Sequence, residues 1–247
     1  MICLKKVSII VINQDSRING ILDVSYGEQK HILIAELQEG ARFMKRNIIT
    51  ISREYGSGGR KIGEMVAERL GIPFYDKEII EETAKAAGMS PDFVAQHEER
   101  LNNNILYNFT VGAIYGLAHP DKPELKNLPA KERIFVIQQE VIQEMADKGP
   151  CVIVGRCADF ILKDREDMLK VFVYADDETR KKRVIEEYGR VPQYIDQTVA
   201  YVDKRRRLHY ESYTTQRWGD RKNYHLMLDS SALGLEICAD IICTAVK

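Results

Sequence analysis

The stretch from Asn47 to Leu70, NIITISREYGSGGRKIGEMVAERL, constrains the fold of this chain more than any other. A short apolar run over 48–51 leads into a cluster of three glycines at Gly56, Gly58 and Gly59. An amphipathic run follows, whose apolar residues share one helical face: Ile62, Met65, Val66 and Leu70. The pattern predicts a strand, a glycine loop and the start of a helix, which is the layout of a phosphate cradle.

The lettering of this loop departs from both standard nucleotide-binding patterns. No Gly-Lys-Ser/Thr run is present, so the pattern G-x-x-x-x-G-K-[ST] is absent. The dinucleotide pattern G-x-G-x-x-G fails as well, because Lys61 stands at its third glycine. Asp76 nevertheless lies 20 residues beyond Gly56, where a ribose-binding acid would be. An NAD-type oxidoreductase therefore stays open as a hypothesis on this spacing alone.

The glycines are also compatible with a tight turn that needs positive φ and binds nothing. Arg60 and Lys61 favour phosphate binding over that interpretation. Two cations in the first turn of a helix oppose the helix dipole unless an anion is bound there.

Composition bounds the class of protein. The chain has 247 residues, 45% apolar and 30% charged, as expected for a globular protein with one good core. A net charge of −1 gives no field that favours nucleic acid or an anionic membrane, and no apolar run approaches the roughly 20 residues of a membrane span. Five cysteines without a C-x-x-C pair predict reduced thiols in the cytoplasm and no metal site. The oligomeric state stays open.

Strands and helices alternate from Asn47 onward. We expect strands at 48–52, 74–75, 151–154, 169–174 and 224–228, and helices at 59–70, 77–87, 131–148, from Asp177, and at 232–246. This order predicts an α/β fold in three layers, with a parallel sheet and helices on both faces. Ligands bind such sheets at the carboxyl ends of the strands, so the glycine loop, Asp76, Arg156 and Asp176 are predicted to meet at one cleft.

Residues 1–43 read differently from the rest, and we assign them no function. Strands are expected at 5–12 and 27–34, with Asn19-Gly20 as a turn. Met44 precedes the strand at 48 and is a natural start for the main domain. The prediction is an N-terminal extension, 1–43, and a nucleotide-binding domain, 44–247.

The chain from Asn47 onward resembles the cytidylate kinase-like family, relatives of bacterial cytidylate kinase among the nucleoside monophosphate kinases. The resemblance rests on ITISREYGSGGRKIG at 49–63, FYDKEII at 74–80, VIVGRCADFIL at 152–162, DKRR at 203–206 and NYHLMLDSSALG at 223–234. It implies a P-loop-type fold with a degenerate Walker A loop and a helical lid at about 190–222.

Against true cytidylate kinases, Gly59 stands at the position of the loop lysine and Lys61 at that of the threonine, while Arg53 replaces the first glycine. The resemblance implies that the loop cradles the donor phosphates, and that Arg60 or Lys61 supplies the missing charge. The implied donor-binding residues are Gly56, Ser57, Gly58, Gly59, Arg60 and Lys61.

Other matches imply the acceptor side. Gly155-Arg156 resembles the family's Gly-Arg-Asp, with Cys157 in place of the aspartate and Asp159 two residues on as a substitute. Asp76 matches the acidic position near the acceptor. As alternatives, Arg156 caps a strand end and Asp76 caps the following helix.

The run from Lys204 to Arg207 resembles the lid, whose arginines close over the phosphates. Asp203 and Arg206 match the family's Asp-x-x-Arg spacing. The run is also compatible with a nucleic-acid patch or a solvated helix face. One helical turn cannot aim four cations the same way, so two are expected to reach a ligand.

Aromatic and histidine side chains carry weaker predictions. Packing is favoured over stacking on a base for four aromatics: Tyr210, Tyr213, Trp218 and Tyr224. Structural or surface positions are favoured over metal binding for four histidines: His97, His119, His209 and His225.

Two hypotheses lead. The first is an enzyme that uses ATP and Mg²⁺ to phosphorylate a nucleoside monophosphate, a pyrimidine one such as CMP, with Arg60, Lys61 and Arg206 as the charged catalytic groups. Asp76, Arg156, Asp159 and Asp203 are then the acceptor-side residues; Asp76, Asp159 and Ser57 are the candidate anchors for Mg²⁺. The second is a non-catalytic nucleotide-binding module, which the absent loop lysine favours.

Overall fold

The computed structural model describes residues 6–12, 18–25, 47–99 and 128–246, and within these the strands form a single sheet. The strand order is β2-β1-β7-β6-β3-β5-β4. The bounds are β1 Lys6–Ile12, β2 Ile18–Ser25, β3 Ile48–Arg53, β4 Phe74–Tyr75, β5 Cys151–Val154, β6 Met168–Tyr174 and β7 Leu226–Asp229. All five strands from β3 to β7 pair in parallel, which confirms the predicted α/β class.

Strand β3 lies inside this sheet and pairs with β5 on one side and with β6 on the other. Five of its six residues are buried, as expected for a strand covered on both faces. The connection from β3 leads to β4, on the side of β3 where β5 lies. The connection from β5 crosses to β6, on the opposite side of β3. The carboxyl end of β3 is therefore the switch point where an open α/β sheet binds ligands.

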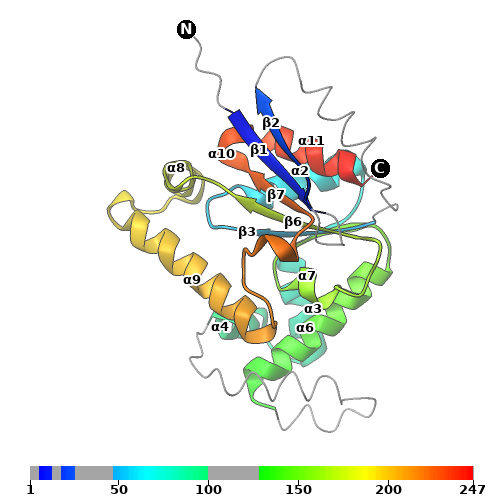
Figure 1. The fold of residues 1–247 in the computed structure, drawn as a ribbon. Helices are drawn as coiled ribbons and strands as arrows, with labels where there is room; N and C mark the ends of the chain where they lie inside the picture. Colours follow the sequence, from blue (N-terminus) through cyan, green and yellow to red (C-terminus); the bar gives the residue numbers. More distant parts are fainter. Residues whose placement is uncertain (1–5, 13–17, 26–46, 100–127, 247) are drawn as a thin grey trace.

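Helices cover both faces of the sheet (Figure 1). On one face, α2 (Gly59–Leu70) and α11 (Leu235–Ala245) pack on the branched side chains of β3, β5, β6 and β7, including Ile49, Val152 and Val171. On the other, α3 (Lys77–Ala87), α6 (Ala130–Asp147) and the short α7 (Ala158–Ile161) bury Ile48, Ile153 and Met168. Helix α4 (Pro91–Glu99) packs beside α3 and α6.

The N-terminal strands extend the parallel sheet with an antiparallel hairpin. Strand β1 pairs along β2 and meets β7 at Val11 and Leu226. The predicted turn at Asn19-Gly20 is wrong, because Gly20 lies inside β2 opposite Val11, beside a register shift in the ladder. The predicted strand at 27–34 lies outside the described residues, and the boundary at residue 43 stays a prediction.

The predicted helix at 232–246 is divided at Gly234. That residue has φ 79° and ψ 162°, outside the helical region, and it separates α10 (Ser230–Leu233) from α11. The other helix ends follow ordinary capping rules: Gly71 and Gly88 close α2 and α3 in the left-handed conformation. Asp176 begins α8 by accepting the Thr179 amide at 2.8 Å.

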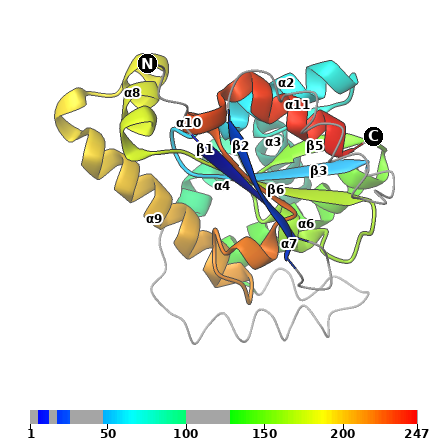
Figure 2. The same cartoon turned by 45° about the horizontal axis from the view of Figure 1, so that its top comes forward.

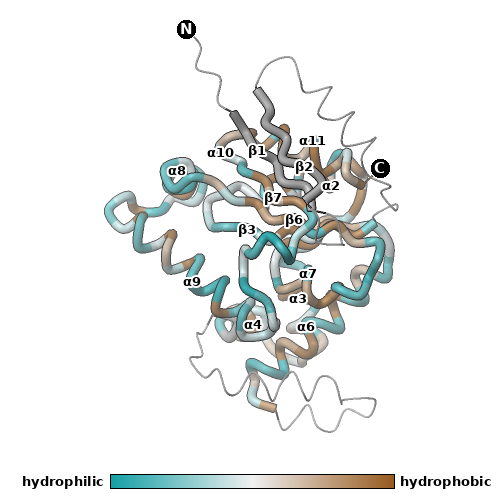
Figure 3. Tube along the Cα trace, viewed as in Figure 1, coloured by the Kyte–Doolittle hydropathy of each residue, from teal (hydrophilic) through white to brown (hydrophobic). Residues whose placement is uncertain are grey.

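Helices α8 (Asp177–Tyr188) and α9 (Ile195–Tyr213) form an arm that projects beyond the sheet (Figure 2). A short 3₁₀ turn, Pro192–Tyr194, joins them, and a second, Arg221–Asn223, leads from α9 back to β7. Hydrophobic residues concentrate on β6 and β7, whereas much of α8 and α9 is hydrophilic (Figure 3). Most of the predicted lid at 190–222 is thus one long helix, α9.

The glycine loop between β3 and α2 is packed from behind by α8 and α11. Gly56 has φ +79°, and a Cβ there would lie 2.6 Å from the carbonyl oxygen of Arg180. Gly58 has φ +78°, and its Cβ would lie 2.5 Å from Leu235 Cδ2. Both glycines are therefore required by backbone conformation and by packing, whether or not the loop binds phosphate.

We expect Gly56→Ala to lower the free energy of unfolding by about 3 kcal/mol, because left-handed strain adds to a clash with backbone. Gly71→Ala is the matched control: Gly71 has φ +65° but nothing within 4 Å of its Cβ position. It should cost only about 1 kcal/mol. Urea denaturation of both variants measures this, and equal losses would contradict the packing argument.

Candidate functional site

The predicted donor side of the site is the N-terminal end of α2. The amides of the first turn of a helix have no intrahelical partner, and the N-cap residue Gly58 has no side chain to satisfy them. Within the loop itself, the Ser57 amide donates to the Glu54 carbonyl oxygen at 3.3 Å. The buried Ser57 hydroxyl donates to the same oxygen at 2.9 Å. The helix start can therefore receive an anion, but the Ser57 hydroxyl is already engaged.

The two loop cations are paired with carboxylates. Arg60 Nε lies 2.8 Å from Asp76 Oδ2, and Arg60 Nη1 lies 3.1 Å from Glu64. Lys61 is 62% exposed and lies 3.9 Å from Glu64. The Asp76 carboxylate raises the pKa of Arg60 and does not cap α3. Asp76 and Glu64 therefore supply the negative charge that we expected a bound anion to supply beside Arg60 and Lys61.

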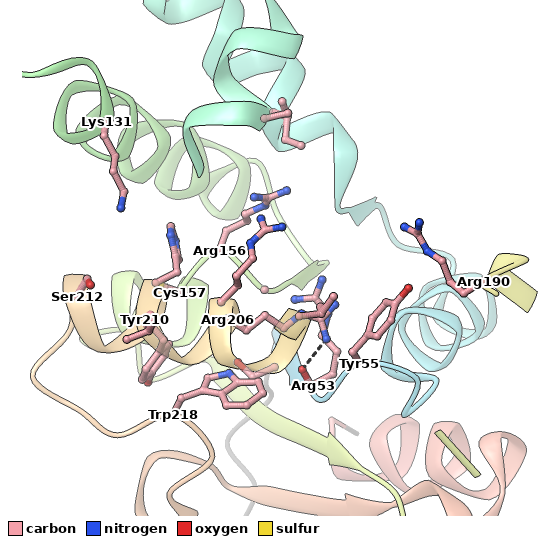
Figure 4. A pocket seen from close by; sticks show the side chains of 18 residues that line it. Arg53, Tyr55, Lys131, Arg156, Cys157, Arg190, Arg206, Tyr210, Ser212 and Trp218 are labelled. Carbon is pink, nitrogen blue, oxygen red and sulfur yellow. Dashed lines mark hydrogen bonds between the residues drawn. The ribbon is translucent and has the colours of Figure 1, made fainter. Parts of the chain in front are cut away.

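A cavity of about 340 Å³ opens beside the loop, at the carboxyl ends of β3 and β5 and under α9 (Figure 4). Ser52, Arg53 and Tyr55 line it from the end of β3, and Gly155, Arg156 and Cys157 from the end of β5. Residues 56–61 do not line it. The cavity therefore lies next to the loop, on the side of the switch point where the acceptor is predicted to bind.

The walls of the cavity are cationic. Among the described residues that line it, none is Asp or Glu, and six carry a full positive charge: Arg53, Lys131, Arg156, Arg190, Arg205 and Arg206. Two of these, Arg156 and Arg206, were predicted as site residues. Of the four lid cations, Arg205 and Arg206 line the cavity and Lys204 and Arg207 are exposed, in line with the expected two.

Arg53 is the most crowded of these cations. Its guanidinium lies against Gly155, where a Cβ would come 2.1 Å from Arg53 Nη1. Its carbonyl oxygen accepts a bond of 3.1 Å from Arg206 Nη1. Burial, together with Arg206 and Arg156, lowers the pKa of Arg53 to about 9, and Nε is buried without a hydrogen-bond partner among the described residues. The sequence signal that could have identified Arg53 as a site residue is its place at the first glycine of the loop pattern.

A strained turn positions Arg156. Gly155, Arg156 and Cys157 have φ of +78°, +56° and +55°, and two of them are not glycine. Such non-glycine positions cost on the order of 1 kcal/mol each and persist where the surrounding structure holds them. The turn takes the chain from β5 into α7 and leaves Arg156 at the cavity wall.

Asp159 lies beneath the cavity rather than in its wall. It is 3% exposed, and its Oδ2 accepts from the Tyr210 hydroxyl at 2.8 Å. Ser52 Oγ lies 3.4 Å from Oδ1. Burial raises the pKa of the Asp159 carboxyl. Asp159 thus positions Tyr210 and Ser52, which do line the cavity.

Asp203 connects the arm to the loop. Its Oδ1 accepts the Tyr55 amide at 2.7 Å, and its Oδ2 pairs with the buried Arg180. Arg180 in turn donates to the Tyr55 carbonyl oxygen at 2.9 Å and lies 3.3 Å from Glu54. Both carboxylate oxygens of Asp203 are engaged by the protein, so its contacts are those of a loop anchor.

Aromatic and histidine residues divide between packing and lining. Tyr213 stacks on Phe135 with ring centroids 3.8 Å apart, and Tyr224 packs on Phe172. Tyr210 and Trp218 line the cavity. His209 lines it too, and its ring packs against Phe135 and Tyr213. His225 accepts the Lys170 amide at its Nδ1 over 3.1 Å, while the side chains of His97 and His119 lie outside the described residues.

Several expected site features fall elsewhere. Asp176 caps α8 and does not line the cavity. The described residues contain no group of three metal-ligating side chains, and the four described cysteines are free. Over the same residues, no helix is long and apolar enough to cross a membrane.

The loop anchor predicts a stability difference between two acids that share Arg180. Asp203→Ala should lower the free energy of unfolding by about 3 kcal/mol, because it removes the main partner of a buried cation. Asp177 lies 3.6 Å from the same arginine but is 76% exposed, so Asp177→Ala should cost less than about 1 kcal/mol. Chemical denaturation tests both; similar losses would show that Asp203 is not the anchor.

His209 predicts a pH dependence. Burial, with Arg156, Lys131 and Arg205, lowers its pKa to about 3. The unfolded chain takes up this proton near pH 6.5 and the folded protein does not, so stability falls as the pH drops below 6.5. Between pH 7 and 5 the native protein should lose about 2 kcal/mol more than His209→Gln. Parallel pH dependences in thermal or urea unfolding would contradict a neutral, buried His209.

Comparison with known proteins shows the family of this chain. A curated protein of Archaeoglobus fulgidus named Cytidylate kinase is 26% identical over 204 residues, covering 81% of this chain and 94% of the relative. The crystal structure of an uncharacterized protein from Eubacterium ventriosum matches with a TM-score of 0.59 and 25% identity, over 81% of this chain and 98% of that one. The model of the cytidylate kinase-like family matches residues 48–232, more than half of the chain, so this chain belongs to the cytidylate kinase-like family.

Proposed function

We propose that this protein is a phosphotransferase that moves a phosphoryl group from ATP to a phosphorylated small-molecule acceptor in the cytoplasm. The observation that carries the proposal is the cationic cavity beside the open start of α2, at the switch point of the sheet. The curated relative is named Cytidylate kinase, so a pyrimidine nucleoside monophosphate such as CMP is the first acceptor to test.

The donor phosphates would lie at the loop, against the amides of Gly56 to Gly59 and the start of α2. Arg60 and Lys61 are the nearest loop cations, and a triphosphate would have to compete for them with Asp76 and Glu64. Asp203 would keep the loop in place through the Tyr55 amide. This division gives the loop a binding role and leaves charge stabilisation mainly to the cavity.

The transferred group would meet the cavity at Arg53, Arg156 and Arg206. Phosphoryl transfer needs positioning and charge stabilisation rather than covalent help from the protein. Arg53 replaces a loop glycine, and its guanidinium lies against Gly155 at the cavity wall, beside the loop from which the usual lysine is absent. One planar guanidinium group can bind two phosphate oxygens at once. The three arginines can therefore contact the phosphates of both ATP and the acceptor.

ATP and Mg²⁺ fit these residues unequally. The helix start and nearby arginines suit a polyphosphate. The three candidate anchors for Mg²⁺ do not suit the ion, because each is already engaged by the protein. Asp76 pairs with Arg60, the buried Asp159 accepts a hydrogen bond from Tyr210, and the Ser57 hydroxyl donates to the Glu54 carbonyl oxygen. Proteins commonly hold Mg²⁺ through substrate phosphates with few carboxylates. We therefore assign no step to a protein-held Mg²⁺.

A non-catalytic nucleotide-binding module is the second candidate function. It is favoured by the loop itself, which lacks the usual lysine and whose two cations are both bound to carboxylates. In that case the arm would respond to nucleotide without transferring its phosphate.

The test is a coupled assay with ATP, Mg²⁺ and a panel of nucleoside monophosphates, with Arg53→Met beside the native protein. We expect turnover that falls at least about 100-fold in the variant, since one charge-stabilising donor is lost. The variant should keep or gain thermal stability, because a buried cation is removed. Arg53→Lys should recover part of the rate.

Arg207→Met is the control, since Arg207 is exposed on α9 outside the cavity, and its rate should equal that of the native protein. Nucleotide binding without turnover on any acceptor would support the non-catalytic module. Thermal protection by NADH but not by ATP would favour an oxidoreductase.

A further inference from the structure

Tyr55 is the point at which the glycine loop meets the arm. Its amide donates to Asp203 Oδ1 at 2.7 Å, and its carbonyl oxygen accepts from Arg180 Nε at 2.9 Å. Its half-buried side chain packs against the small core between α8 and α9, which contains Val184 and Val199. The backbone and the side chain of Tyr55 are therefore both held by the arm.

Two further side chains of the arm contact the Tyr55 ring. Tyr188, the last residue of α8, stacks on it with ring centroids 5.7 Å apart and 20° between the ring planes. The guanidinium carbon of Arg206, on α9, lies 5.5 Å from the centroid of the Tyr55 ring. The face of an aromatic ring attracts a cation, and the attraction is stronger where water is excluded. The ring thus contacts one aromatic and one cationic side chain, each from a different helix.

Arg206 is held at the cavity wall by three contacts. Its Nη1 donates to the Arg53 carbonyl oxygen at 3.1 Å, the dashed bond in Figure 4, and lies 3.9 Å from Asp203 Oδ1. The Tyr55 ring is the third contact. A guanidinium carries five N–H donors in one plane, so a single hydrogen bond from Nη1 leaves others that can bind a ligand.

The Tyr55 ring is the contact that restricts the plane of this guanidinium. One hydrogen bond from one nitrogen allows the group to turn about that bond, and Asp203 at 3.9 Å is too distant to direct it. A fixed plane matters because a guanidinium binds two phosphate oxygens at once only in the correct orientation. Burial lowers the pKa of Arg206, so its charge is poorly solvated and an anion beside it would be favourable.

We propose that Tyr55, supported by Tyr188, is a positioning residue that holds the Arg206 guanidinium in the plane in which it binds phosphate oxygens. The inference rests on the proposed function in taking a phosphate group as the ligand of Arg206. The glycine loop then acts on the ligand in two ways, through its own amides and through the arginine that its tyrosine orients.

The test is a double-mutant cycle in which binding of inorganic pyrophosphate is measured calorimetrically without ATP. Tyr55→Leu removes the aromatic face and keeps an apolar side chain against the core of the arm. We expect it to weaken pyrophosphate binding about tenfold, because the Arg206 plane is no longer restricted. In the Arg206→Met background, the same substitution should change the affinity by less than about twofold. Arg53 and Arg156 still line the cavity in that background, so binding remains measurable.

Three variants control the cycle. Tyr55→Phe keeps the ring, so its affinity should stay within about twofold of that of the native protein. Tyr188→Leu should weaken binding about threefold, because it removes only the support of the ring, and it carries the test where Tyr55→Leu does not fold. Tyr194→Leu makes the same change at a tyrosine of the arm that is 53% exposed, and it should leave the affinity unchanged.

The inference falls if native protein binds no pyrophosphate, or if Tyr55→Phe weakens binding as much as Tyr55→Leu. It also falls if Tyr55→Leu weakens binding equally with and without Arg206, since Tyr55 would then have only a structural role. The phosphotransfer assay separates these failures from that of the proposed function. An Arg206-dependent effect of Tyr55→Leu without transfer to any acceptor would keep the positioning role and remove the phosphotransferase. Transfer without such an effect would do the reverse.

Discussion

The crowding of cations at one end of the sheet is the constraint on which the candidate site depends. Arg53, Arg156 and Arg206 converge at the carboxyl ends of β3 and β5, and burial with this crowding lowers the pKa of Arg53 to about 9. A fold keeps such an arrangement at a cost in stability, which is commonly found where function requires it. An anionic ligand would relieve the repulsion, so binding and stability are linked in this cavity.

Carboxylates elsewhere in the protein are used to hold cations outside the cavity. Asp76 and Glu64 bind Arg60, and Asp203 and Glu54 bind Arg180. The protein thus pairs the cations around the glycine loop with acids, whereas the described lining of the cavity contains no Asp or Glu, and Arg206 has Asp203 at 3.9 Å outside that lining. This separation, more than the number of basic residues, distinguishes the site from a solvated charged surface.

The strand–loop–helix order could be predicted from residues 47–70, because apolar periodicity and glycine position fix local structure strongly. The place of Lys131 in the cavity wall could not be predicted from the sequence. Lys131 begins an amphipathic helix and looks like an ordinary surface residue until the fold brings it opposite α9. Asp203 was matched to a family spacing, but only the tertiary structure reveals that Tyr55 and Arg180 engage both its oxygens. The predicted turn at Asn19-Gly20 is wrong because the pairing of β2 with β1 overrides the local turn preference.

The attachment of Asp203 has a mechanical consequence. It lies midway along α9 and is fixed to the strand end through Tyr55, so the helix cannot move away from the loop without breaking the ion pair with Arg180. Arg205, Arg206 and His209 lie on the C-terminal side of this attachment, and the exposed Tyr194 precedes the N-terminal end of the helix. Loss of the attachment at Asp203 would therefore disturb both the glycine loop and the cavity residues that α9 contributes.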